Sequence, residues 1–294
     1  MVLTTRQAVL ITAYKNVEQI VDIINYLGDN FEFYIHIDKK STMDLSPIEG
    51  IDYVHLFKIF HVNWGSVSHL KCILLLSEKA LADRRNEYFH LITGQDFPVK
   101  PVNYFFNELD MRKDYIGYFA MPATDCWTEE NGGMDRLEYY RPFEVFNDKT
   151  MIGRKILRSL LFIQKKIKRK RKYPRAIFPD FYGGGTYWSL TRDSLQYVLD
   201  FTNKNEKAIK SMNYTFCPEE FYFQTILLNS NRACNIVNDN LRYIDWNSGR
   251  GRPAFLDTTD YEKIKSSNKL FARKFHESDS EELKRLIINS QSKR

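Results

Sequence analysis

The sequence lacks the cysteine pattern of a metal site or a disulfide framework. Its 294 residues contain only four cysteines, which lie far apart and form no CxxC pair: Cys72, Cys126, Cys217 and Cys234. Structural zinc sites need closely spaced cysteines, and disulfide frameworks are typical of much shorter secreted chains. We therefore expect neither, and we expect a reducing, cytoplasmic compartment.

Long apolar runs are also missing. The opening residues, MVLTTRQAVLITAY, contain a strand-length apolar stretch instead of a signal peptide. No segment has the roughly 20 consecutive apolar residues of a membrane-spanning helix. This pattern predicts a soluble or peripheral protein without an N-terminal membrane anchor.

Glycine-rich phosphate cradles are absent, because the chain has neither a GxGxxG motif nor a P-loop. The first hundred residues nevertheless alternate between strand and helix patterns. Strands are expected at 7–14, 31–38, 50–59 and 88–94, and helices at 16–28, between Asn16 and Gly28, and at 66–83. This alternation predicts an α/β fold with a mostly parallel central sheet flanked by helices. Later strands are expected at 183–190 and 240–246, and later helices at 191–203, 217–230 and 279–292.

One segment contains no negative charge. Residues 151–175 hold eleven Lys and Arg and no acid, and without these charges the net charge of +6 becomes −5. Its isoleucines and leucines fall partly on one helical face, as in basic amphipathic helices that adsorb to anionic membranes. A solvated, disordered insertion is an equally good interpretation. Nucleic-acid binding is disfavoured, because the rest of the chain is acidic.

Seven segments, in order over about residues 9–275, resemble one glycosyltransferase family. They are FYIHIDKKS, VNWGSVSHLKCILLLSEKAL, HLITGQDFPVK, GGGTYWSLTRDSLQYVL, CPEEFYFQTILLN, LRYIDW and LFARKF. The family, glycosyltransferase family 14, contains the core-2-type β-1,6-N-acetylglucosaminyltransferases and the peptide O-xylosyltransferases. Animal members carry an N-terminal membrane anchor. The opening residues here do not have that pattern, so this chain looks like a bacterial member.

The resemblance implies a single GT-A domain over 1–294, an inverting mechanism, a UDP-sugar donor, no cofactor and no required divalent metal. Residues 1–100 would form the nucleotide-binding half and 101–294 the acceptor-binding and catalytic half, with 151–175 as a basic helical insertion. N-acetylglucosamine is the favoured sugar and xylose the alternative, and the acceptor would be a glycan or lipid-linked glycan. A non-catalytic carbohydrate- or membrane-binding module on the same fold is the competing hypothesis.

Donor binding is expected at the carboxyl end of the sheet, where ligands of open α/β sheets bind. Asp38 ends a predicted strand there, and the resemblance places it near uridine and ribose, which we favour over an Asp that only caps the following turn. Lysines 39 and 40 follow it, so the DxD pair that holds a metal in most GT-A enzymes is broken.

Trp64 lines the donor pocket in this resemblance, or else belongs to the core. Asp96, in GQDFP, is interpreted as a turn cap.

Cations must then neutralise the departing UDP, because charge stabilisation at the leaving group is usually the largest catalytic contribution. The resemblance assigns this task to Lys274 of LFARKF, together with either Arg250 or Arg252 of GRGRP. On the acceptor side it indicates Arg136, Tyr140, Trp246 and Glu219. For Arg136 and Tyr140 the competing interpretation is a solvated charged face, and for Trp246 a place in the core.

The catalytic base is assigned to Glu220. An inverting transferase needs one carboxylate to take the proton of the acceptor hydroxyl, whereas a glycosidase needs two that flank the bond. Consecutive helical residues diverge by about 100°, so only one of Glu219 and Glu220 can face the site. The family motif is Pro, an acid and then the catalytic Glu, which is Pro218-Glu219-Glu220 here. Pro218 would start an α-helix, with Glu220 at its third position and ionised by the helix dipole.

Overall fold

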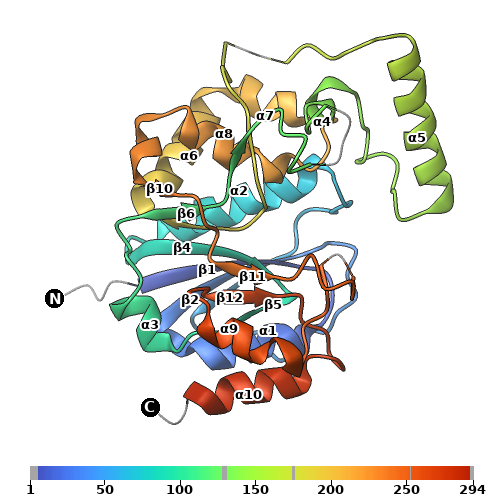
Figure 1. Ribbon diagram of the computed structural model, residues 1–294. Helices are drawn as coiled ribbons and strands as arrows, with labels where there is room; N and C mark the ends of the chain where they lie inside the picture. The colour runs from blue at the N-terminus through green and yellow to red at the C-terminus, as the bar shows by residue number, and fades with distance from the viewer. Residues whose placement is uncertain (1–5, 128–130, 174–175, 252, 292–294) are drawn as a thin grey trace.

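A seven-stranded mixed sheet forms the centre of the molecule in the computed structural model, which describes residues 6–127, 131–173, 176–251 and 253–291 (Figure 1). The strand order is β10-β6-β9-β4-β1-β2-β3. Its members are β1 (Arg6–Ala13), β2 (Phe31–Ile37), β3 (Val54–Phe57), β4 (Asn86–Thr93), β6 (Asp114–Ile116), β9 (Trp188–Thr191) and β10 (Ile236–Val237). Only β9 runs antiparallel to its neighbours, so the mostly parallel sheet is confirmed. This is the GT-A arrangement that the resemblance implied.

Helices cover both faces of the sheet (Figure 1). One face packs against α2 (Val67–Ala82), α6 (Arg192–Lys204), α7 (Glu206–Met212) and α8 (Tyr222–Leu228). The other packs against α1 (Val17–Leu27), α3 (Val102–Asn107), α9 (Tyr261–Ser266) and α10 (Glu281–Gln291). Every residue of β2 is therefore buried, which explains its almost continuous apolar sequence FEFYIHI.

The predicted limits of α1 are confirmed. The Asn16 side chain accepts a hydrogen bond from the Gln19 amide at 3.1 Å, and Gly28 follows the last helical turn with φ 68°. Asn16 is itself left-handed, with φ 64°, a conformation that asparagine tolerates better than most residues. The turn between β1 and α1 therefore holds the carboxyl end of β1 in place.

Two small sheets complete the framework. One contains β11 (Arg242–Ile244), β12 (Phe271–Arg273) and β5 (Asp96–Pro98), and the other pairs β7 (Phe119–Ala120) with β8 (Tyr182–Gly183). The strands expected at 50–59 and 240–246 are thus shorter, and the one expected at 183–190 is two strands of different sheets. Short 3-10 turns lie at η1 (Gly28–Asn30), η2 (Pro218–Glu220), η3 (Asn231–Asn235) and η4 (Thr258–Asp260).

The prediction of one continuous helix over 217–230 is wrong for the first turn of that helix. Pro218–Glu220 form the separate 3-10 turn η2, and α8 begins only at Tyr222. The two are divided at Phe221, whose backbone leaves the helical region at φ −147° while its side chain is completely buried. Glu220 is therefore not the third residue of an α-helix, and the helix-dipole argument for its charge does not hold.

The basic segment forms α5 (Met151–Lys166), which stands apart from the sheet and from the other helices (Figure 1). The short helix α4 (Asp135–Glu138) precedes it. Among the helices that the structure describes, none is both long and apolar enough to span a membrane.

Candidate active site

Glu220 lies at the end of η2, where its side chain is partly open to solvent. The turn begins at Cys217, which is left-handed with φ 48°, and the amide of Gly184 donates to the Glu220 carbonyl at 2.8 Å. Nη1 of Arg136 donates to Oε2 of Glu220 at 2.5 Å. The carboxylate is 29% exposed while the arginine side chain is 8% exposed, so one face of Glu220 is held and another is accessible.

Arg136 is not the solvated charge that the competing interpretation expected. Its guanidinium carbon lies 3.6 Å from the centre of the Trp127 ring and 5.1 Å from that of Phe216. The close packing needs Gly133, which has φ +86° and where a Cβ atom would lie 1.9 Å from the Trp127 ring. Stacking between two aromatic faces fixes the guanidinium and aims it at Glu220.

Glu219 points away from its neighbour and into the interior. It is 5% exposed, and its Oε1 lies 3.1 Å from Nδ1 of His69, while Oε2 is buried with no hydrogen-bond partner among the described residues. Nε2 of His69 in turn lies 3.1 Å from the Thr12 hydroxyl. This carboxylate connects η2 to α2 and β1, and its burial gives no support to the expectation that it meets the acceptor.

Asp38 lies at the carboxyl end of β2, but its carboxylate is engaged in a turn. Oδ1 accepts hydrogen bonds from the amides of Lys40 at 3.0 Å and Val62 at 3.2 Å. These bonds hold the segment after β3 against the sheet edge, and the side chain is almost buried. The turn-capping interpretation is what the structure describes. Asp96, completely buried and bonded to the amide and hydroxyl of Thr93, likewise has the expected structural role.

Trp64 and Trp246 are not core residues. Trp64 is 50% exposed and packs its edge on Phe216, with ring centres 5.1 Å apart, while Trp246 is 52% exposed. The ammonium of Lys149 lies 5.0 Å from the Trp64 ring centre. Exposed indole faces of this kind are available to a ligand.

Three lysines lie near enough for the charges of two of them to act on the third, and we call Lys15, Lys149 and Lys274 the lysine cluster. Lys15 follows β1 and Lys274 follows β12, while Lys149 lies just before α5. Partial burial lowers the pKa of Lys274, and the positive charges of Arg273, Lys15 and Lys149 lower it further. Among the described residues, no carboxylate forms an ion pair with any of the three lysines. The cluster therefore has positive charge to offer to an anion.

Arg250 is already occupied by three carboxylates. Its guanidinium pairs with Asp245 at 3.1 Å, Asp257 at 2.7 Å and Asp260 at 2.8 Å. Such an arginine has little capacity left for a diphosphate, so the assignment of Arg250 to this task has no support in its contacts. Arg252, the other candidate, lies outside the described residues.

A continuous row of contacts joins the lysine cluster to Glu220. Lys149 lies over Trp64, Trp64 packs on Phe216, Phe216 lies under Arg136, and Arg136 binds Glu220. Tyr140 is 47% exposed, and its ring centre lies 6.2 Å from that of Tyr214. The row thus connects a held carboxylate, an exposed aromatic ring and a lysine that no described carboxylate pairs with.

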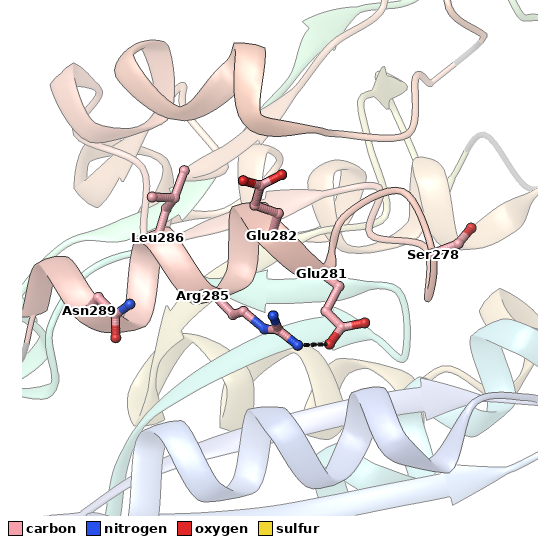
Figure 2. Close-up of a pocket in the computed structure, with 6 residues that line it drawn as sticks. All are labelled: Ser278, Glu281, Glu282, Arg285, Leu286 and Asn289. Carbon is pink, nitrogen blue, oxygen red and sulfur yellow. Dashed lines mark hydrogen bonds and ion pairs between the residues drawn. The ribbon is translucent and has the colours of Figure 1, made fainter.

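Other regions of the described structure are weaker candidates for a ligand site. The hollow along α10 drawn in Figure 2 is lined by Ser278, Glu281, Glu282, Arg285, Leu286 and Asn289. Its one cation, Arg285, is paired with Glu281 at 2.6 Å, and α10 lies at the other end of the molecule from α8 (Figure 1). Within the described parts of the chain, no three His, Cys, Asp or Glu side chains gather in a way that could hold a metal ion.

Sequence reasoning missed His69, Trp127, Lys15 and Lys149. Lys15 had a usable signal, because it directly follows a predicted parallel strand. Trp127 and Lys149 belong to the irregular region before α5, where no periodicity predicts which side chains meet. His69 is one turn into a predicted helix, and its contact with Glu219 spans 150 positions.

Known proteins resemble this chain over most of its length. A family model described as "Branch: Core-2/I-Branching enzyme" matches residues 8–268. Xylosyltransferase 1 of Mus musculus is 25% identical over 236 residues, which are 77% of this chain and 22% of that protein. A xylosyltransferase of Ciona intestinalis is 22% identical over 297 residues, 92% of this chain and 32% of that protein. The chain spans less than a third of the length of these relatives.

Two solved structures show a looser likeness. The apo-form glycosyltransferase GlyE of Streptococcus pneumoniae has a TM-score of 0.40 and 10% identity, over 98% of this chain and 64% of its own. The galactosyltransferase LgtC, in complex with donor and acceptor sugar analogues, has a TM-score of 0.41 and 9% identity, over 97% and 96%.

Proposed function

Because this chain belongs to the Core-2/I-branching enzyme family, we propose that it is an inverting glycosyltransferase. It would move a sugar from a UDP-sugar to a hydroxyl group of a glycan in a single displacement. The observation that carries the proposal is the pair of Glu220 and Arg136. It supplies one accessible, oriented carboxylate beside exposed aromatic rings and unpaired cations.

Glu220 acts as the general base in this proposal. The acceptor hydroxyl attacks the anomeric carbon while its proton passes to the solvent-exposed side of the Glu220 carboxylate, and the bond to UDP breaks on the opposite side. Arg136 fixes the orientation of Glu220 and stays ionised beside it. The interior position of Glu219 agrees with a one-base mechanism, because a glycosidase would need a second carboxylate facing the same bond.

The lysine cluster takes the place of a metal in this proposal. The departing diphosphate develops negative charge, and preorganised cations stabilise such charge most where water is scarce. Lys274 is the residue that the family resemblance indicates. Since three aspartates hold Arg250, we assign the supporting positive charge to Lys15 and Lys149. No cofactor and no divalent metal is required.

N-acetylglucosamine is the donor sugar that we propose first. Xylose is the second candidate, favoured by the names of the xylosyltransferases that this chain resembles. We propose a glycan or lipid-linked glycan as acceptor, with Tyr140 and Trp246 as exposed rings on which sugar faces can pack. We also place the reaction in the cytoplasm, at the inner face of the membrane.

The test is the variant Glu220→Gln, assayed for UDP release with a panel of UDP-sugars. Loss of a general base lowers turnover by about 10²–10⁴-fold, whereas UDP affinity should stay within about twofold of wild type. Glu262→Gln, at an exposed glutamate, is the matched control and should be fully active. EDTA should leave the rate unchanged.

Three outcomes would contradict parts of this proposal. Full activity of Glu220→Gln would remove the base assignment. Inhibition by EDTA that added metal reverses would remove the metal-free mechanism. Absence of UDP release with every UDP-sugar, in a folded protein that still binds glycans, would favour the non-catalytic module.

A further inference from the structure

Helix α5 presents apolar side chains to solvent to an unusual degree. Ile152, Phe162 and Ile167 are 69%, 65% and 61% exposed, and within the helix only Gly153 and Leu157 are buried. In Figure 1 the helix stands away from the sheet and the other helices, and the exposed fractions of these three side chains show that they lie open to solvent. Exposed apolar patches of this kind mark interaction sites.

The isoleucines of this segment are arranged in a stripe, in which Ile156 is half-buried and the other three are exposed. Four isoleucines follow one another at spacings of four, seven and four residues, which places them on one helical face: Ile152, Ile156, Ile163 and Ile167. We call this row the isoleucine stripe. Phe162 and Met151 lie to one side of it, among the basic residues. The stripe is continuous along the helix, as a surface that meets a flat partner requires.

Basic side chains border the stripe. Lys155 and Lys166 flank it, Arg158 lies beyond them, and Lys168 and Arg169 follow the end of the helix. Among the residues described, no carboxylate pairs with any of these five. The segment 151–175 contains no acid at all, so the partner that complements it is anionic.

The combination of basic and exposed apolar side chains on α5 distinguishes between two kinds of anionic partner. A nucleic acid offers phosphates to the lysines but nothing to a row of exposed isoleucines and a phenylalanine. An anionic bilayer offers both: charged headgroups for the basic residues and an acyl boundary for the apolar ones. We propose that α5 lies flat on an anionic lipid surface, with the isoleucine stripe and Phe162 in the headgroup region.

The rest of the structure fits this orientation. Gln164 of α5 accepts from the Tyr140 amide at 2.8 Å and donates to the Tyr140 carbonyl at 3.0 Å. After the helix, Lys170 pairs with Glu138 at 2.8 Å, and Arg171 donates to the carbonyls of Ser211 and Asn213. These bonds tether a membrane-bound α5 to the acceptor side of the site. The inference rests on the proposed function for the identity of that site and deepens its proposed location.

Vesicle co-sedimentation of the whole chain, without sugar nucleotide, tests the inference. The probes are phosphatidylcholine vesicles with and without about 30 mol % phosphatidylglycerol. We expect wild-type protein to sediment with the anionic vesicles at least about tenfold more strongly than with the neutral ones, and salt to weaken the binding. The variant Ile152→Ser/Ile163→Ser, and separately Lys155→Gln/Lys166→Gln, should each lose most of it.

The control variants carry the same kinds of substitution at exposed positions outside α5. Leu286→Ser on α10, 37% exposed, and Lys204→Gln/Lys207→Gln, on exposed lysines of α6 and α7, should bind like wild type. Unfolding midpoints confirm that each variant is folded. Equal binding of the α5 variants, equal binding to neutral vesicles, or preference for duplex DNA over vesicles would each overturn the inference. Turnover on a soluble acceptor is measured separately, so its failure identifies an error in the proposed function instead.

Discussion

At the residue scale, the cationic side of the candidate site consists of lysines that form no ion pair with a carboxylate among the residues that the structure describes. Lys149 is the most informative of them, because its backbone belongs to the segment before α5 while its ammonium lies over Trp64. A diphosphate at the strand ends would replace part of the repulsion among Lys15, Lys149 and Lys274 with attraction. The lysine cluster should therefore discriminate nucleotides by their phosphates.

Lys149→Met should weaken UDP binding by about tenfold, which corresponds to about 1.4 kcal/mol for one lost charged contact. Uridine, which has no phosphate, should bind the variant and wild type equally. Isothermal titration with UDP and uridine measures both. Lys207→Met provides the control on an exposed lysine of α7. An unchanged UDP affinity, or an equal loss for uridine, would show that Lys149 does not contact the phosphates.

The sequence predicts some candidate site residues but not the contacts that these residues make. Short motifs single out Glu220 and Lys274 as candidates, and the end of a parallel strand singles out Asp38, whose carboxylate caps a turn in the structure. The partners of these residues are not predicted, because contacts such as that of Arg136 with Trp127 depend on how an irregular segment folds back. A pattern of charged residues in the sequence also does not reveal whether a charged side chain is already paired in the fold. Nothing in GRGRP reveals that three aspartates already surround Arg250.

At the element scale, the turn η2 that carries Glu220 is held by the backbone at Gly184 rather than by the helix that follows it. The amide of Gly184 donates to the Glu220 carbonyl, and a Cβ atom at Gly184 would lie 2.1 Å from the Gly117 carbonyl oxygen. Strand propensity predicted the long elements of the first half well. It could not predict the interruption at Phe221, because burial of that side chain overrides the local helical pattern.

Gly184→Ala should destabilise the protein by about 1–3 kcal/mol, as overpacked interiors do, and should lower turnover by moving η2. Gly185→Ala is a close control, because the nearest atom to its Cβ would be 3.7 Å away. Urea unfolding and UDP release measure the two effects. Equal stability and activity of the two variants would mean that the backbone at Gly184 relaxes without disturbing Glu220.

At the scale of the whole molecule, the sheet has a separate apolar layer on each face. The lower layer in Figure 1 includes Leu283 and Ile287 of α10, which lies beyond the residues that the family model matches. Lys284 of the same helix forms an ion pair with Asp22 of α1. The C-terminal helix is therefore part of the folded core that supports β1 and β2.

Leu283→Ala should lower the free energy of unfolding by about 2–5 kcal/mol, because it leaves a cavity in a completely buried site. Leu286→Ala, on the solvent side of α10, should change it by less than about 0.5 kcal/mol. Urea titrations followed by tryptophan fluorescence measure both. A small effect at Leu283 would indicate that α10 can detach while the sheet stays folded.

Protons compete with Arg250 for two of the carboxylates around it, those of Asp245 and Asp257. Hydrogen bonds from the Asn247 amide, Ser248 and Arg250 lower the pKa of Asp245, and those from Thr259 and Arg250 lower that of Asp257. Carboxylates with depressed pKa values stabilise the fold above their ordinary value of 3.8, and this contribution disappears as the pH falls below it. Asp245 and Asp257 thus make the contacts of Arg250 sensitive to acid, and the nearby Leu256 amide donates to the carbonyl of Lys274, so acid should loosen the chain beside the strand end that carries Lys274.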